Sequence, residues 1–226
     1  MEQQYRRKSI FSMLPPATLN LIIINTLLWL GELVLLRYGV SLVNLFGMHY
    51  FEAPSFGFWQ LISYAFLHDE ASFSHLFFNM FALFMFGGQV ERMWGSGRFL
   101  LFYAVCALTA AITQQAVWYL GLHDAALMSA GYATEQYVTI GASGAVFGLL
   151  LAFGMLFPNA VIYMFFIPIP IKAKYFVIFY GVIELLLGIK GMQTGVAHFA
   201  HVGGMIGGLV LILLWRKRGR IGGPYN

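Results

Sequence analysis

The sequence predicts an all-α membrane protein, a bundle of six transmembrane helices with an interfacial loop after the first helix. Composition is the first observation behind this prediction. Of the 226 residues, 60% are hydrophobic and only 10% are charged, whereas soluble domains carry about 25% charged residues. The mean hydropathy of +0.75 agrees. We therefore expect an integral membrane protein, and we expect residues 1–226 to form a single membrane domain.

Apolar segments of spanning length are the second observation. About 20 mainly apolar residues cross the ~30 Å hydrocarbon core of a bilayer as a helix. The predicted spans cover residues 17–37, 75–91, 99–120, 139–158, 172–190 and 198–216. The run 159–171 is also apolar, but Pro168 and Pro170 interrupt it. We expect a helix end there, followed by a re-entrant or interfacial connection.

The distribution of lysine and arginine is the third observation, and it sets the orientation. If the N-terminus is inside, eleven of these cations fall on the inner side and only Arg37 and Lys190 fall outside. This asymmetry predicts that both termini face the cytoplasm. The run 19–36 is long and ends without a small-residue cleavage site, so it is interpreted as a span and not a signal peptide. We expect no organelle-targeting signal, and this expectation favours a bacterial inner membrane.

The segment 38–74 is then extracytoplasmic and has an unusual composition for an exposed loop. Gly47, Pro54 and Gly57 prevent it from spanning the membrane. Its aromatic residues are Phe51, Phe56, Phe58, Trp59, Tyr64 and Phe66. Aromatic side chains concentrate at the level of the lipid headgroups. We expect this segment to lie in the membrane interface.

Composition also excludes several classes of function. The single cysteine, Cys106, rules out an intramolecular disulfide framework. The six histidines cannot supply zinc-finger spacing without cysteines. Although the isoelectric point is near 9.2, the cations lie at segment ends and form no basic stripe, so nucleic acid is not an expected partner.

Polar residues inside the spans converge on one level of the predicted bundle. His75 and Asn79 lie in the first turns of the second span, and His198 and His201 lie in the first turns of the sixth. Ser143 lies about one turn into the fourth span. These three spans all begin on the outer side, and each residue rises ~1.5 Å along a helix. The five side chains are therefore expected roughly 5–10 Å below the outer boundary.

Small residues around Ser143 and His201 favour a close approach of their helices. Gly144 and Gly148 form one small-xxx-small pair, and two further pairs, Gly203/Gly207 and Gly204/Gly208, follow His201. Such pairs let membrane helices pack closely. A serine hydroxyl becomes a good nucleophile when an adjacent base takes its proton, and neutral imidazole is the usual base. His75, Asn79 and the backbone N–H of Ser143 are the candidate oxyanion donors.

These motifs resemble the rhomboid family of intramembrane serine proteases. The resemblance runs from about His75 to Gly208. It rests on His75-x-x-x-Asn79, Glu91 before Gly95-Ser96-Gly97, Gly141-Ala142-Ser143-Gly144 and Ala200-His201-Val202-Gly203-Gly204. Four motifs in this order, on spans of the right direction, are specific.

The resemblance implies a water-filled cavity that opens to the outside and a Ser143–His201 dyad without a catalytic acid. It implies an oxyanion site formed by His75, Asn79 and the backbone around Ser143, including Gly141. Phe147 occupies the position of an aromatic residue that stacks on the catalytic imidazole. The implied substrates are single-span membrane proteins, cut near their outer ends, with a small residue beside the scissile bond. No metal or organic cofactor is implied.

Two departures from the family pattern concern residues near the site. Trp59-Gln60 stands where many members have Trp-Arg, so any anchoring role of that arginine is expected to be absent or moved. His198 creates an additional His-x-x-His pattern, whose role the sequence leaves open. The fifth span is the expected gate for substrates, because Gly191 and Gly195 follow it.

Less specific interpretations stand beside the catalytic ones. Ser143 alone is explained by helix packing, and His75 by a hydrogen bond to a loop carbonyl. His198 and His201, with His75 nearby, are an alternative metal site. For Glu184 we favour pairing with a loop donor over orienting an imidazole. Glu32 is expected to extend toward the membrane surface or to pair with Arg37. Glu91 is expected to form a structural cluster on the inner side with Arg92 and Arg98.

Two rival functions belong to other classes. The first is an inactive rhomboid-like protein that binds membrane helices as a chaperone. Such relatives typically lack the serine or the histidine, whereas Ser143 and His201 are both present. The second is a small transporter, which would place charged residues and broken helices near the middle of the bilayer. The polar cluster here lies near one surface. The oligomeric state and the natural substrate are not determined by the sequence.

Overall fold

The computed structural model describes residues 14–122, 134–164, 167–190, 197–219 and 221. Its longer helical segments follow the six predicted spans. They are α1 (Pro16–Leu35), α4 (Phe73–Ala82) continued by a π-helical turn and α5 (Gly88–Trp94), α6 (Ser96–Leu122), α8 (Ser143–Leu156), α9 (Ala173–Ile189) and α10 (His198–Lys217). The shorter helices are α2 (Leu42–Phe46) and α3 (Gln60–Ser63). Two antiparallel strand pairs, β1 (Met48–His49) with β2 (Val138–Thr139) and β3 (Val161–Met164) with β4 (Ile167–Lys172), add small sheets to the helical fold.

Four helical segments of the described chain are long and apolar enough to cross a membrane. They are Pro16–Tyr38, Phe73–Trp94, Ser96–Gly121 and His198–Lys217. Helix α9 has 17 residues and α8 only 14. Fourteen residues rise about 21 Å, which is less than the ~30 Å hydrocarbon thickness. The predicted fourth span, residues 139–158, is therefore only partly helical.

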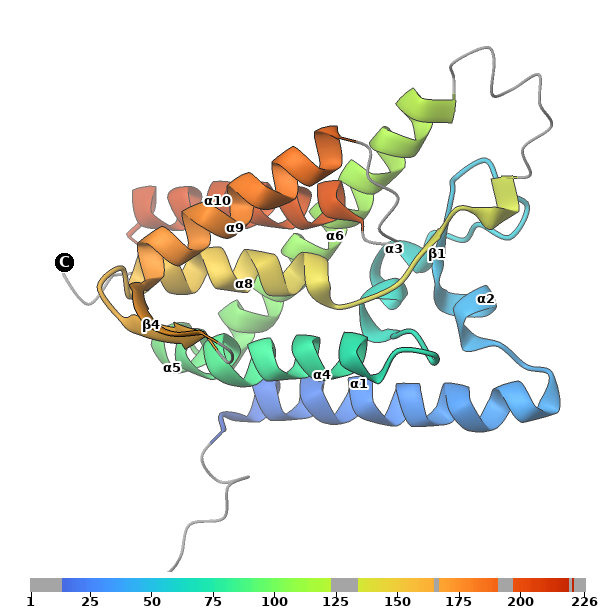
Figure 1. The fold of residues 1–226 in the computed structure, drawn as a ribbon, viewed down its shortest axis with the longest axis horizontal. Coiled ribbons are helices and arrows are strands. Elements are labelled where there is room, and N and C mark those ends of the chain that lie inside the picture. The colour runs from blue at the N-terminus through green and yellow to red at the C-terminus, as the bar shows by residue number, and fades with distance from the viewer. Residues whose placement is uncertain (1–13, 123–133, 165–166, 191–196, 220, 222–226) are drawn as a thin grey trace, which may run out of the picture.

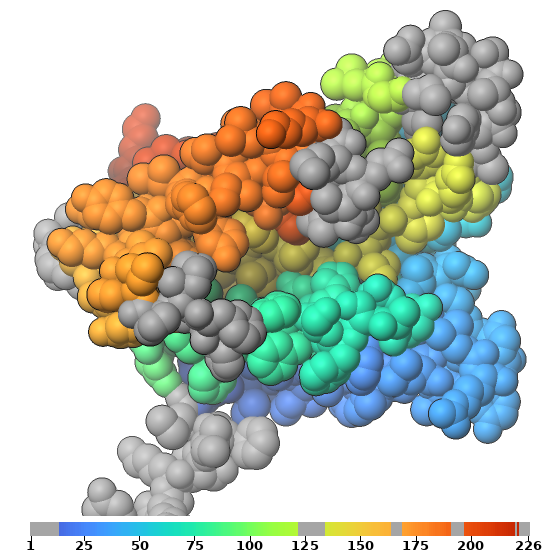
Figure 2. All heavy atoms as spheres, viewed as in Figure 1, coloured from blue at the N-terminus to red at the C-terminus, as the bar shows by residue number. Residues whose placement is uncertain are grey.

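Helix α8 is the most buried of the long helices and contacts α4, α5, α6, α9 and α10, and α10 packs most extensively on α6 and α8. Figure 1 shows α1 and α4 side by side along one edge, with α9 and α10 on the opposite side of α8. In the space-filling view, α8 (yellow) is recessed between α4 (teal) and α9 (orange) (Figure 2). Large apolar side chains on the outer faces are exposed, for example Leu27 on α1 and Ile178 on α9. This distribution suits a bundle surrounded by lipid.

Glycines let α6, α8 and α10 pack closely on one another. A Cβ atom at Gly204 would collide with the carbonyl oxygen of Gly144, and one at Gly148 would collide with Cys106 on α6. On the other face of α10, a Cβ atom at Gly207 would overlap the Thr109 side chain of α6. The small-residue pairs seen in the sequence therefore permit the close approach of α8 and α10.

The connection after α8, predicted as a helix end with a re-entrant or interfacial segment, is extended and not helical from Val161 to Lys172, apart from residues 165–166, which are not described. Strands β3 and β4 form an antiparallel hairpin in which Tyr163 pairs with Pro170. Alternating isoleucine and proline residues favour extended backbone in this sequence, Ile167-Pro-Ile-Pro-Ile171. Proline is tolerated because each strand of a two-stranded sheet has an unpaired edge.

The segment between α1 and α4 is held by buried side-chain amides and a carboxylate. Gln60 Oε1 accepts from the His49 N–H at 3.2 Å, and Gln60 Nε2 donates to the Ser55 carbonyl at 2.9 Å. Gln60 thus anchors this loop, although the family pattern led us to expect the anchoring role to be absent or moved. Phe58 and Trp59 are 82% and 61% exposed, as the interfacial interpretation requires.

The two glutamates at the ends of α1 are structural, but their partners are not the expected arginines. Glu32 accepts from the Ser41 hydroxyl at 3.0 Å and from the Leu42 N–H at 2.6 Å, so the predicted pairing with Arg37 was wrong. Glu91 accepts from the N–H groups of Ala17 and Thr18 at 2.9 and 2.7 Å. A carboxylate at the N-terminus of α1 satisfies free N–H groups and opposes the positive end of the helix dipole.

Candidate active site

Ser143 is the first residue of α8, and not one turn inside a helix as the sequence suggested. The preceding Gly141 has φ of +125°, a conformation that L side chains rarely adopt. The first intrahelical bond runs from the Val146 N–H to the Ala142 carbonyl. The N–H groups of residues 143–145 therefore precede the hydrogen-bond ladder of the helix, where they are suited to receive negative charge.

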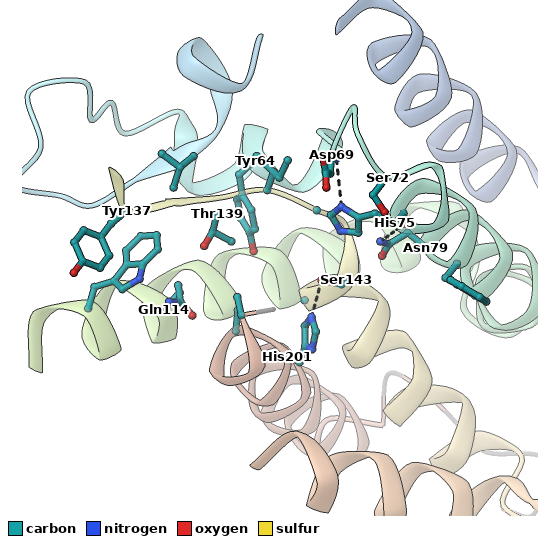
Figure 3. A pocket seen from close by; sticks show the side chains of 18 of the residues that line it. Tyr64, Asp69, Ser72, His75, Asn79, Gln114, Tyr137, Thr139, Ser143 and His201 are labelled. Atoms are coloured by element: carbon teal, nitrogen blue, oxygen red, sulfur yellow. Dashed lines mark hydrogen bonds between the residues drawn. The ribbon is translucent and has the colours of Figure 1, made fainter. Parts of the chain in front are cut away.

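His201 lies in the first turn of α10 and faces Ser143 (Figure 3). Its Nε2 atom is 2.7 Å from Ser143 Oγ. One face of the imidazole stacks on Phe147, with ring centroids 4.3 Å apart and planes inclined by 10°. Ser143 and Phe147 are one helical turn apart on α8, so a single helix supplies both contacts.

The other nitrogen of His201 contacts a buried carboxylate. Glu184 Oε2, on α9, lies 2.8 Å from His201 Nδ1 and 2.7 Å from His198 Nδ1. The family resemblance implied a dyad without an acid, so this third group is a departure from that expectation. Imidazole was the less favoured partner of Glu184 in the sequence analysis, yet the described partners of its carboxylate are these two rings.

His75 and Asn79 lie across from Ser143 on α4. The Asp69 N–H donates to His75 Nδ1 at 3.3 Å, which leaves the proton of a neutral His75 on Nε2. A Cβ atom added to Gly141 would lie 2.8 Å from His75 Nε2 and 3.6 Å from Ser143 Oγ. The space beside Gly141 is therefore shared by an N–H donor and the hydroxyl. Asn79 Nδ2 donates one hydrogen bond to the His75 carbonyl at 2.8 Å.

His68 packs against His75, with ring centroids 5.0 Å apart. Neither ring nitrogen of His68 has a hydrogen-bond partner within the described part of the chain. Burial, with a smaller contribution from His75, lowers the pKa of His68 to about 3. This histidine is therefore neutral at physiological pH and places no cation beside His75.

A cavity of about 1040 Å³ brings most of the predicted site residues together (Figure 3). Its wall includes His75, Asn79, Gly141, Ser143 and His201. Phe147 and His198 do not line the cavity. Phe147 stacks on the His201 ring, and His198 contacts Glu184. The sequence analysis missed Tyr64 and Gln114, which also line the cavity. A polar residue inside the predicted third span is the one signal that could have indicated Gln114 as a site residue. Tyr64 had no such signal, because its sequence position does not distinguish it from the other aromatic residues of the segment 38–74.

Glu184, His198 and His201 are also the described residues best placed to hold a metal ion. One ligand atom from each lies within 4.8 Å of the others. The metal alternative weighed from the sequence had His75 as third ligand; the structure instead puts Glu184 there. The connection containing Gly191 and Gly195 lies outside the described residues.

Comparison with known proteins identifies a family and several relatives of this chain. A family model described as the rhomboid domain matches residues 55–218. The rhomboid protease AarA of Providencia stuartii is 30% identical over 213 residues, which are 86% of this chain and 71% of AarA. The putative rhomboid protease YdcA of Bacillus subtilis is 31% identical over 69% of this chain and 66% of its own length.

A third relative, the rhomboid protease GluP of Bacillus subtilis, is much longer than the matched region. It is 32% identical over 66% of this chain, but the match spans only 24% of GluP. The chain thus corresponds to a part of such relatives. The region matched by the family model covers most of the chain and includes every motif on which the resemblance rests. This protein is an integral membrane protein of the rhomboid family.

Proposed function

We propose that this protein is a serine endopeptidase that cleaves transmembrane segments of membrane proteins. The observation that carries the proposal is the 2.7 Å contact between Ser143 Oγ and His201 Nε2 at the wall of a large cavity. An imidazole nitrogen at this distance is positioned to take the hydroxyl proton. The rhomboid proteases among the relatives of this chain support the same activity.

In the proposed reaction, Ser143 Oγ attacks the carbonyl carbon of the scissile peptide bond while its proton moves to His201 Nε2. The tetrahedral intermediate collapses as the C–N bond breaks, and His201 returns the proton to the leaving amine nitrogen. A water molecule then attacks the acyl-enzyme ester and gives a proton to His201. As the ester C–O bond breaks, His201 returns this proton to Ser143 Oγ, which restores the hydroxyl and the neutral imidazole and releases the acid product.

The oxyanion of both tetrahedral intermediates needs donors that are already in place. His75 Nε2–H and the Ser143 N–H are proposed donors, and the position of Gly141 between them leaves room for the oxygen. The second amide hydrogen of Asn79 is the proposed third donor. Each such donor typically contributes a factor of about 10²–10³ to kcat.

The proposed substrates are single-span membrane proteins that enter from the surrounding lipid. A helical peptide bond is hydrogen-bonded and shielded, so the substrate must unwind locally before attack. Glycine or proline near the cleavage site lowers the cost of this unwinding. We further propose a bacterial inner membrane as the location, with six spans, both termini in the cytoplasm and the cavity open to the outside. The distribution of lysine and arginine supports this orientation.

The test compares the purified protein with Ser143→Ala and His201→Ala in liposomes that contain a tagged single-span substrate with a glycine or proline near its outer end. Cleavage by the native protein and a loss of at least about 10³-fold in both variants are expected. A fluorophosphonate should label the native protein and spare Ser143→Ala. Ser63 is a half-buried serine that donates to the Phe46 carbonyl and does not line the cavity, so Ser63→Ala is the matched control and should cleave normally.

Equal cleavage by the native protein and Ser143→Ala would exclude this nucleophile. If the native protein cuts none of several helix-weakened substrates and reacts with no fluorophosphonate, the helix-binding alternative replaces the protease.

A further inference from the structure

The proposed Ser143–His201 pair is extended by a carboxylate on a third helix. We propose that Glu184 is a positioning residue for His201, so that the site works as a Ser143–His201–Glu184 triad. This inference rests on the proposed protease function. It also goes beyond that function, because the family resemblance implied a histidine that acts without an acid.

Hydrogen-bond geometry at the imidazole supports this role. Glu184 Oε2 is 2.8 Å from Nδ1 of His201, and Ser143 Oγ is 2.7 Å from Nε2 of the same ring. An ionised carboxylate only accepts hydrogen bonds, so the proton of neutral His201 must lie on Nδ1. The lone pair of Nε2 then faces the serine hydroxyl. Glu184 thereby selects the tautomer in which His201 can act as a base.

Burial strengthens the interaction at the moment of proton transfer. The Glu184 side chain is 10% exposed and that of His201 is 8% exposed. When His201 receives the serine proton it becomes a cation beside this carboxylate, in surroundings of low dielectric constant. The charge-assisted bond is therefore strongest after the proton has moved. Glu184 does not line the cavity, so it acts through His201 and not on the substrate.

His198 holds the carboxylate of Glu184 in the position from which it contacts His201. Its Nδ1 atom is 2.7 Å from the same Glu184 oxygen. The two rings stand nearly perpendicular, with planes at 89° and centroids 6.4 Å apart. They approach Oε2 from two directions, and both belong to the first turn of α10. The additional His-x-x-His pattern thus has a physical role in holding Glu184 at His201.

The distances favour hydrogen bonds over a shared metal ion. Zinc binds nitrogen and oxygen ligands at about 2.0–2.2 Å, and tetrahedral ligands are then about 3.3 Å or more apart. The two Nδ1 atoms lie only 2.7 and 2.8 Å from Oε2. These separations match charge-assisted hydrogen bonds.

Kinetics of Glu184→Gln test the proposal. The glutamine keeps the size of the side chain, but it loses the charge and can donate its amide N–H to Nδ1, which favours the wrong tautomer of His201. We expect kcat to fall by about 10²–10⁴-fold with little change in KM. Glu184→Asp keeps the charge at a longer distance and should restore part of the lost kcat. His198→Ala should cause a smaller loss than Glu184→Gln, because the direct contact to His201 remains.

Glu32→Gln is the matched control, because it also neutralises a buried carboxylate that accepts two hydrogen bonds. It should keep its kcat even if the protein melts at a lower temperature. A spectroscopic readout separates positioning from stability. Nitrogen NMR of ¹⁵N-histidine-labelled protein, with His201→Asn to assign the signal, should show the proton of His201 on Nδ1. In folded Glu184→Gln part of the population should shift to Nε2.

The outcomes distinguish this proposal from the proposed function. Loss of cleavage in Ser143→Ala together with native kcat and an unchanged tautomer in Glu184→Gln would overturn the triad and leave the protease intact. A lower melting temperature as the only change in Glu184→Gln would overturn it too. Tight Zn²⁺ binding that requires Glu184 and is needed for cleavage would replace the triad by a metal site. Cleavage that persists in Ser143→Ala would overturn the protease itself.

Discussion

At the scale of single residues, Gly141 shapes the oxyanion side of the cavity. Its φ of +125° turns the chain from strand β2 into helix α8. The missing side chain leaves the space between His75 Nε2 and Ser143 Oγ open. One residue therefore supplies both the turn that frees the N–H groups of α8 and the volume that the reacting oxygen would occupy.

Gly141→Ala should reduce cleavage strongly. The new Cβ would lie 2.8 Å from His75 Nε2 and push this donor away, and the positive φ would add strain of about 1–3 kcal/mol. We expect kcat to fall by about 10²-fold, as for the loss of one oxyanion donor. The measurement is steady-state cleavage of the tagged substrate in liposomes.

Gly121→Ala on α6 is the matched control for this prediction, because a Cβ atom there meets nothing within 4 Å. It should leave kcat unchanged. Native activity in Gly141→Ala would show that the space beside this glycine is not used in the reaction.

At the scale of elements, the contact between α8 and α10 places the nucleophile beside its base. Ser143 begins α8, and His201 lies in the first turn of α10. Gly204 of α10 packs on the backbone of Gly144. A hydrogen bond of 2.7 Å tolerates little displacement, so the spacing of these two helices decides whether the pair forms.

Gly204→Ala should separate the two helices and weaken both activity and stability. Its Cβ atom would collide with the Gly144 carbonyl, which belongs to backbone and cannot rotate away. Overpacking of this kind costs about 1–3 kcal/mol. We expect a lower melting temperature in detergent together with a loss of cleavage. Ile206→Ala, at a 56% exposed position of α10, should retain cleavage; a fully active, equally stable Gly204→Ala would contradict this account of the packing.

For the molecule as a whole, the distribution of cationic side chains is the basis of the proposed orientation. Arg216 and Lys217 end α10, and Lys172 and Lys174 flank the start of α9. The β3–β4 hairpin lies beside these cations, whereas the exposed aromatic side chains Phe58 and Trp59 lie in the segment between α1 and α4. The positive-inside tendency therefore supports the proposed orientation, in which the hairpin and the aromatic segment lie on opposite sides of the membrane.

Cysteine accessibility tests this orientation. Cys106 is buried and is the single native thiol, so its replacement by alanine gives a background without cysteine. Phe58→Cys and Tyr163→Cys then introduce one thiol at exposed positions, 82% and 68% exposed in the native protein. A membrane-impermeant maleimide should label Phe58→Cys in intact cells and Tyr163→Cys only after permeabilisation. The reverse pattern would invert the proposed topology.

Much of the fold was predictable because hydrophobic length and charge act locally. The apolar runs located each of the long helical segments, since a chain in lipid must satisfy its backbone within the segment. The strands of the β3–β4 hairpin were not predicted, because an apolar run interrupted by prolines is compatible with several local structures. The shortening of α8 was also missed: non-helical backbone at membrane depth is tolerated only where it lines a cavity, and the cavity depends on all the helices around it.

From the sequence alone we could predict the membrane class, the approximate spans, the orientation and a common depth for His75, Asn79, Ser143 and His201. These follow from composition, periodicity and rise per residue, which need no knowledge of neighbours. The folded structure was needed to find that Glu184 reaches His201, that Gln60 anchors the loop and that Glu91 caps α1. Each of these contacts joins residues far apart in the chain or in different elements, and hydrogen bonding requires a distance near 3 Å that no spacing along a sequence specifies.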